Sequence, residues 1–140
     1  MSKIKVLLVE DSELAIGIYE KMLNSSRHIE VVGKATNGIE GLNLTFELEP
    51  DVICTDLQMP EMDGIEFTKL VMAHHPTPIL VLSNKVKKNN IDIIFAAMKA
   101  GALDVMAKPQ ISANYESMLK ELITKIRILA RKKVSPIPLN

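Results

Sequence analysis

Charged and polar side chains follow four segments that have the composition of buried β-strands. They are Glu10 and Asp11 after residues 4–9, Asp56 after residues 52–55, Ser83 after residues 79–82 and Lys108 after residues 105–107. Ligands of doubly wound sheets bind at the carboxyl ends of the strands. Three carboxylates, a hydroxyl and an ammonium group are therefore expected to meet at one edge of a sheet.

The chemistry of this set points to a hard divalent cation. Two carboxylates a few ångströms apart repel by roughly 4 kcal/mol at an effective dielectric constant of 20, so they need a counter-charge or a shared proton. Oxygen ligands suit Mg²⁺ (or Mn²⁺), whereas zinc prefers His or Cys, which these positions do not offer. Each acid alone could be a helix cap. The three carboxylates, the hydroxyl and the ammonium group are all expected at the same edge of the sheet, and this coincidence favours a binding site over separate helix caps.

The elements that would position these groups alternate along the chain. Apolar runs rich in β-branched residues predict strands, and amphipathic segments between them predict helices. The first helix is expected to bury Leu14, Ile18, Met22 and Leu23, and the second to bury Leu42 and Phe46. A last, long helix is expected to begin at a Ser112 cap. The expected strands are residues 4–9, 30–35, 52–55, 79–82 and 105–107; the expected helices are 13–24, 39–48, 64–75, 91–100 and one from about 113 to 130. Such alternation implies an α/β fold with a parallel sheet covered on both faces.

Composition narrows the class of protein. The 140 residues fit one domain, and the net charge of zero, from 17 basic and 17 acidic side chains, argues against a nucleic-acid-binding protein. One Cys cannot form an intramolecular disulfide, which favours a reducing compartment. Apolar runs are too short to cross a membrane, and the start of the chain lacks a signal-peptide pattern. A cytoplasmic protein is expected, with a basic, proline-containing tail or linker at residues 131–140.

The segment Asp56-Leu-Gln-Met-Pro-Glu-Met-Asp-Gly64, together with Glu10-Asp11, Ser83 and Lys108-Pro109, closely resembles the receiver domains of two-component response regulators. The resemblance covers roughly residues 3–130 and implies a single flavodoxin-like (βα)5 domain over residues 1–130 with strand order 2-1-3-4-5. Within the family, residues 30–33, 76–78 and 101–109 are most similar to the receiver of chemotaxis protein-glutamate methylesterases.

The resemblance also implies a role for each polar residue. Asp56 would accept a phosphoryl group from a sensor histidine kinase or a phosphotransfer protein, and the domain would then switch a protein-interaction face. The downstream partner is an unidentified protein or a second copy of the chain. Asp11, Asp56 and the backbone carbonyl of Gln58 would ligate Mg²⁺, and Glu10 would contact the ion through a water molecule. Ser83 would donate a hydrogen bond to the phosphoryl group. Lys108 would form an ion pair with the phosphoryl group, oriented by a cis Lys108–Pro109 bond.

Several positions depart from the pattern of the family. Val105 replaces the Tyr or Phe whose ring usually turns inward on phosphorylation, so the usual aromatic switch is missing. Glu10 stands where Asp is common. Asn84 is larger than the small residue often found there and would narrow access for the phosphodonor, and Lys85 would influence attack of water on the acyl phosphate.

Other functions remain as alternatives. A phosphatase of the haloacid dehalogenase type is disfavoured, because Gln58 stands where such an enzyme has a second acid. The nucleophile motif Gly-x-Ser-x-Gly is absent, so no separate enzyme is expected in this chain beyond catalysis of its own phosphorylation and dephosphorylation. The chain could also be the regulatory receiver fragment of a chemotaxis methylesterase, or a degenerate receiver that binds partners without phosphorylation.

Overall fold

The computed structural model describes residues 2–84, 91–109 and 114–139. Within these residues, five strands and five helices alternate along the chain. They are β1 (Ile4–Val9), α1 (Glu13–Asn24), β2 (Ile29–Ala35), α2 (Gly38–Leu48), β3 (Val52–Thr55), α3 (Gly64–His74), β4 (Ile79–Ser83), α4 (Ile91–Ala100), β5 (Asp104–Ala107) and α5 (Tyr115–Leu129).

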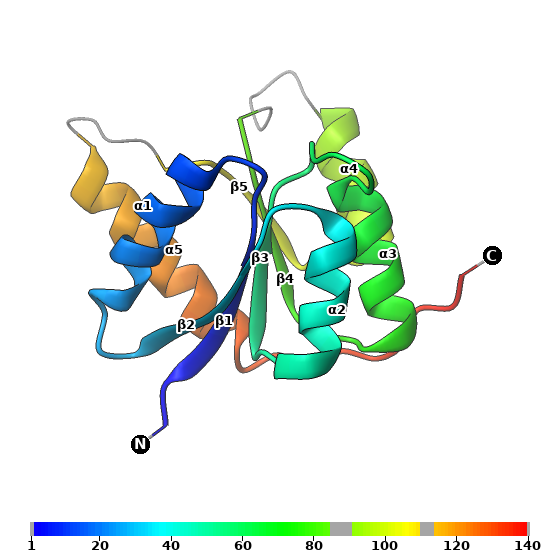
Figure 1. Cartoon of the computed structure of the whole chain (residues 1–140), viewed down its shortest axis with the longest axis horizontal. Helices are drawn as coiled ribbons and strands as arrows, with labels where there is room; N and C mark the ends of the chain where they lie inside the picture. Colours follow the sequence, from blue (N-terminus) through cyan, green and yellow to red (C-terminus); the bar gives the residue numbers. More distant parts are fainter. Residues whose placement is uncertain (1, 85–90, 110–113, 140) are drawn as a thin grey trace.

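The strands form one parallel sheet in the order β2-β1-β3-β4-β5. Helices α1 and α5 cover one face, and α2, α3 and α4 cover the other (Figure 1). This confirms the predicted flavodoxin-like fold and its strand order. No helix in the described part of the chain is long and apolar enough to span a membrane.

Side-chain caps fix where three of the helices begin. Ser12, Asn37 and Asp63 each accept a hydrogen bond from the backbone N–H three residues further on. Such caps satisfy donors that the first helical turn leaves without a partner. Ser12 directly follows Asp11, and Asp63 ends the loop that begins at Asp56, so the same loops both start the helices and present the acidic residues.

The apolar core lies on both faces of the central strands. All residues of β3 and β4 are buried, as expected for parallel strands between two helical layers. Towards α1 and α5 the core contains Leu8, Cys54, Leu80, Leu122 and Ile126, and towards α2, α3 and α4 it contains Leu7, Ile53, Phe67, Val71 and Val81. The central strands are therefore held rigidly, and so are the polar residues at their carboxyl ends.

The buried faces of two helices differ from the sequence-based expectation. Leu14 is 78% exposed, because α1 directs Ile16, Tyr19, Met22 and Leu23 into the core instead. Phe46 is about half exposed, and its ring lies edge-on against His75. Strand bounds also shift by one residue, with β2 starting at Ile29, β4 ending at Ser83 and β5 starting at Asp104.

The tail after α5 returns along the molecule. It runs past the amino ends of the strands, from α5 to the end of α3 (Figure 1). Val134 packs against the core beneath α3 and α4, and the Ile137 N–H donates to the carbonyl oxygen of Met72 at 2.9 Å. The proposed cap Ser112 and the proposed hydrolysis-tuning residue Lys85 lie outside the described residues.

Candidate functional site

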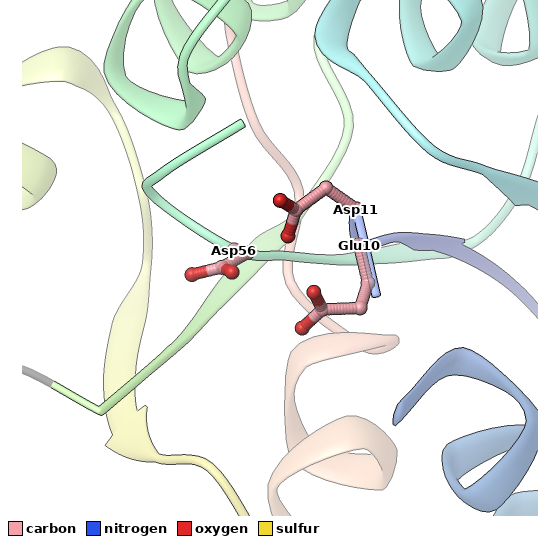
Figure 2. Close-up of side chains that lie close together, drawn as sticks. All are labelled: Glu10, Asp11 and Asp56. Atoms are coloured by element: carbon pink, nitrogen blue, oxygen red, sulfur yellow. The ribbon is translucent and has the colours of Figure 1, made fainter. Parts of the chain in front are cut away.

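The predicted acidic residues meet at the carboxyl ends of β1 and β3. Glu10 and Asp11 leave the end of β1 in different directions, and Asp56 follows β3 beside them (Figure 2). One carboxylate oxygen from each of the three lies within 4.8 Å of the other two. Glu10 is 3% exposed and Asp56 7%, whereas Asp11 faces solvent. The site is thus a buried carboxylate pair with an exposed acid at its mouth.

Lys108 neutralises the buried pair. Its ammonium nitrogen lies 2.7 Å from Asp56 Oδ2 and 2.8 Å from Glu10 Oε1. Burial alone would lower the pKa of Lys108, but the hydrogen bonds to Asp56 and Glu10 outweigh it and raise the pKa above the ordinary lysine value. The ammonium group therefore stays charged at neutral pH and bridges the ends of β1 and β3.

Both carboxylate oxygens of Glu10 have partners. Oε1 accepts from Lys108, and Oε2 accepts from the Ser12 N–H at 3.0 Å. Burial nevertheless raises the pKa of Glu10, aided by the negative charge of Asp56 and opposed by the bonds from Lys108 and Ser12. Glu10 thus contacts Lys108 through one oxygen and the residue that caps α1 through the other.

The loop after β3 is folded tightly around Asp56. Asp56 Oδ1 accepts from the Leu57 N–H at 2.7 Å, and the Gly64 N–H donates to the Leu57 carbonyl at 2.7 Å. A Cβ atom on Gly64 would lie 2.0 Å from the Asp56 carbonyl oxygen, so only glycine fits there. Glu61 has φ of 67°, in the left-handed region. These features hold the Asp56 carboxylate at the open edge of the sheet.

The donor set fits a hard divalent cation. Three carboxylates offer oxygen ligands close together, and the described residues around them contribute neither His nor thiolate to the group. A cation at this position would also offset the negative charge that Lys108 alone leaves uncompensated. Asp11, as the exposed member, is the acid that an ion arriving from solvent would meet first.

The remaining predicted residues lie around this cluster. Ser83 ends β4, is buried, and is in register with Ala107, the residue before Lys108. Gln58 and Asn84 are exposed, and Val105 is half-buried against the core beneath α2, α3 and α4. The expected cis Lys108–Pro109 bond is wrong for this structure, since none of the described peptide bonds is cis. With a trans bond, Lys108 still reaches both carboxylates.

Sequence reasoning missed Tyr19, which lies next to the site. Tyr19 comes from α1 and lines a small enclosed cavity together with Glu10 and Asp56. The signal that could have found it is helical spacing, because Tyr19 lies on the same face of α1 as Ile16 and Leu23.

Comparison with known proteins identifies the family. The family model for the response regulator receiver domain matches residues 6–120, which include every polar residue of the site. The chain belongs to the response regulator receiver family. This receiver is also similar to the response regulator domain of Thermotoga maritima CheB, with 34% identity and a TM-score of 0.84 over 94% of this chain and 99% of that one.

The similar curated proteins are longer than this receiver. It is 38% identical over 135 residues to a protein-glutamate methylesterase/protein-glutamine glutaminase of Carboxydothermus hydrogenoformans, covering 95% of this chain and 38% of that protein. It is 40% identical over 136 residues to the protein of the same name from Methanococcus maripaludis, covering 96% and 37%. The chain thus spans a little over a third of these relatives and corresponds to a receiver domain in them.

Proposed function

We propose that this receiver takes up a phosphoryl group on Asp56 in a Mg²⁺-dependent reaction and passes the change to a protein partner. The supporting observation is the contact of Lys108 with both Asp56 and Glu10, at 2.7 and 2.8 Å, in a buried site. A buried ammonium group held between two carboxylates is positioned to pair with a phosphoryl oxygen added to one of them.

Asp56 is the proposed nucleophile. One of its carboxylate oxygens attacks the phosphorus of the donor, a P–O bond to Asp56 forms, and the bond to the donor's leaving group breaks with its electron pair going to that group. The Leu57 N–H, 2.7 Å from Oδ1, orients the carboxylate for this attack. Hydrolysis of the acyl phosphate later returns the free carboxylate.

Lys108 and Ser83 are the proposed partners of the added phosphoryl oxygens. Lys108 already contacts Asp56, so a small movement of its ammonium group would bring it to an oxygen of the added phosphoryl group. Ser83 ends the neighbouring strand, where its hydroxyl can donate to another phosphoryl oxygen. Charge-assisted contacts of this kind draw the end of β4 and β5 towards Asp56.

Asp11, Asp56 and the backbone carbonyl of Gln58 are the proposed Mg²⁺ ligands, with Glu10 acting through water. When bound, the ion would offset the charge of the incoming phosphoryl group and of the carboxylates. This assignment rests on the three carboxylate oxygens within 4.8 Å of one another.

The proposed donor is a sensor histidine kinase or a phosphotransfer protein, in the cytoplasm. The relatives named as methylesterases favour a specific version, in which this receiver regulates such an enzyme. The receiver would then act on a catalytic domain rather than catalyse a reaction on another substrate. A receiver that binds partners without phosphorylation is the competing possibility.

Intact-mass measurement after incubation with acetyl phosphate and Mg²⁺ tests the proposal. One phosphoryl group per chain is expected in the wild type, and none in Asp56→Asn or with excess chelator. Glu61→Gln serves as a control, since it removes an exposed acid from the same loop and should leave the mass gain intact. A wild type without mass gain would leave the phosphorylation-independent receiver as the better explanation.

A further inference from the structure

Tyr19 is a buried polar residue beside the site that the proposed reaction does not use. It lies on α1 and is 4% exposed. Together with Glu10 and Asp56 it lines an enclosed cavity that has no room for a water molecule. The other walls of the cavity are apolar or backbone-bonded residues of β1, β3 and β4, namely Leu8, Val9, Cys54, Thr55 and Leu82.

The phenol group lies within electrostatic reach of the charged cluster. Burial raises the pKa of Tyr19 to about 12, while the charge of Lys108 lowers it and those of Glu10 and Asp56 raise it. The hydroxyl therefore stays protonated at neutral pH and is a hydrogen-bond donor. Buried tyrosine hydroxyls usually have a hydrogen-bond partner, and carboxylates are strong acceptors.

The ring also connects the site to the packing of α1 and α5. Tyr19 belongs to the core cluster that contains Leu82 from β4 together with Leu122 and Ile126 from α5. On the opposite side, the residue of β5 that could report on the site, Val105, is aliphatic and packs into the other core cluster. Among the described residues, Tyr19 is the aromatic side chain that lines the cavity behind Asp56.

Phosphorylation would change the surroundings of this ring. When Lys108 moves to a phosphoryl oxygen, Glu10 Oε1 loses its 2.8 Å contact. A buried carboxylate oxygen left without a donor is unfavourable, so another donor is favoured. No water fits into the cavity, and Tyr19 lines it beside Glu10 and Asp56.

We propose that Tyr19 is a positioning residue of this receiver, whose hydroxyl donates to the Glu10 carboxylate once Lys108 has moved to a phosphoryl oxygen, and whose ring therefore responds to the phosphorylation state of Asp56. The inference rests on the proposed function, since it requires a phosphoryl group on Asp56. It directs the response towards the α1–α5 side of the sheet.

Tyrosine spectroscopy tests the response directly. The chain has two Tyr residues and no Trp, so Tyr115→Phe leaves Tyr19 as the sole tyrosine, and Tyr19→Phe leaves Tyr115. Addition of Mg²⁺ and beryllium fluoride, a phosphoryl mimic, should change the tyrosine fluorescence and difference absorption of Tyr115→Phe. The same addition should change the signal of Tyr19→Phe less, because Tyr115 packs at the edge of the same core cluster and does not line the cavity. A change confined to Tyr19→Phe, or none in either variant while beryllium fluoride binds, would overturn the inference.

Kinetics of the acyl phosphate separate positioning from simple packing. Tyr19→Phe keeps the ring, so its unfolding midpoint in urea should match that of the wild type. Its acyl-phosphate half-life, followed by intact mass, should change about 3-fold or more, with Tyr115→Phe as the matched control. An unchanged half-life in Tyr19→Phe would overturn the inference while leaving phosphorylation of Asp56 intact. If the wild type gains no phosphoryl group, the proposed function fails and this inference fails with it.

Discussion

At the scale of single residues, the site is an ion pair shared among three side chains. Lys108 contacts Glu10 and Asp56 at similar distances, so neither acid carries its charge alone. Breaking such a buried pair by removing one partner costs more than the pair itself contributes, because a charge is left unpaired. If Lys108 leaves Glu10 or Asp56, the carboxylate that it leaves therefore needs a new partner.

Glu10 gives the site a testable dependence on pH. Burial raises its pKa above 4.5 in the folded protein, so the folded protein binds this proton more tightly than the unfolded chain does. The resulting stabilisation is complete below pH 4.5 and is lost as the pH rises through the folded-state pKa. The free energy of unfolding of the wild type, relative to Glu10→Gln, should therefore decrease as the pH rises above 4.5.

Urea unfolding of both proteins at several pH values provides this measurement. Glu30→Gln is the control, because Glu30 is exposed. A wild type that instead gains stability relative to Glu10→Gln above pH 4.5 would mean that Lys108 outweighs burial at this residue.

Thr68 offers a second prediction about a single buried group. Its hydroxyl is fully buried in α3 and has no hydrogen-bond partner within the described residues. Thr68→Val keeps the shape and removes the unpaired hydroxyl, so the free energy of unfolding should rise by about 1 kcal/mol. Thr45→Val is the matched comparison, because the Thr45 hydroxyl donates to the Gly41 carbonyl at 2.7 Å. Thr45→Val should lower the free energy of unfolding by about 1 kcal/mol. Equal effects of Thr68→Val and Thr45→Val in urea unfolding would contradict this difference in hydrogen bonding.

At the scale of elements, the turn from β3 into α3 determines the position of Asp56. Gly64→Ala would place a methyl group 2.0 Å from the Asp56 carbonyl oxygen, with backbone rather than a flexible side chain in the way. We expect this variant to lose about 3 kcal/mol or more of stability and to accept a phosphoryl group much more slowly.

Gly17→Ala is the control for glycine replacement in a helix. Gly17 is exposed on α1, and a Cβ atom added to it would meet no atom within 4 Å beyond its chain neighbours and the backbone of its own helix, so alanine should stabilise the protein by about 1 kcal/mol. Thermal unfolding and intact mass measure both variants. A Gly64→Ala protein as stable and as reactive as Gly17→Ala would show that the turn is not constrained as described.

The positions of the helices and strands were largely predictable from the sequence. Which face of each helix is buried was less predictable. Caps such as Asn37 and Asp63 mark helix starts through local hydrogen bonds, which depend on neighbouring residues alone. Which apolar residues of a helix face the core depends on its rotation against the sheet. Leu14 and Ile16 both fit a helical period, and tertiary packing selects Ile16.

At the scale of the whole molecule, the tail contributes contacts far from the site. Val134 packs on the core, and the Ile137 N–H bonds to Met72. A chain ending at Lys133 should lose about 1 kcal/mol in urea unfolding, because this apolar contact is removed. Its acyl-phosphate half-life should equal that of the full chain. A truncated protein with full stability would contradict a packed tail.

The site was predictable because parallel strands bring their carboxyl ends together, so Glu10, Asp56 and Lys108 could be placed at one edge without coordinates. Their individual contacts could not be predicted. The preference of Lys108 for both acids, the position of Tyr19 behind them and the path of the tail all depend on side-chain packing between segments distant in sequence.

The central claim is that Asp56 is the residue that carries the phosphoryl group, and its location in the sequence is the most direct test. After reaction with acetyl phosphate and Mg²⁺, borohydride reduction converts an aspartyl phosphate to homoserine, which peptide sequencing by mass spectrometry can locate. We predict homoserine at position 56 alone, and none when Mg²⁺ is withheld. Homoserine at position 11 or elsewhere, or unmodified Asp56 in a protein shown to carry the phosphoryl group, would contradict the claim.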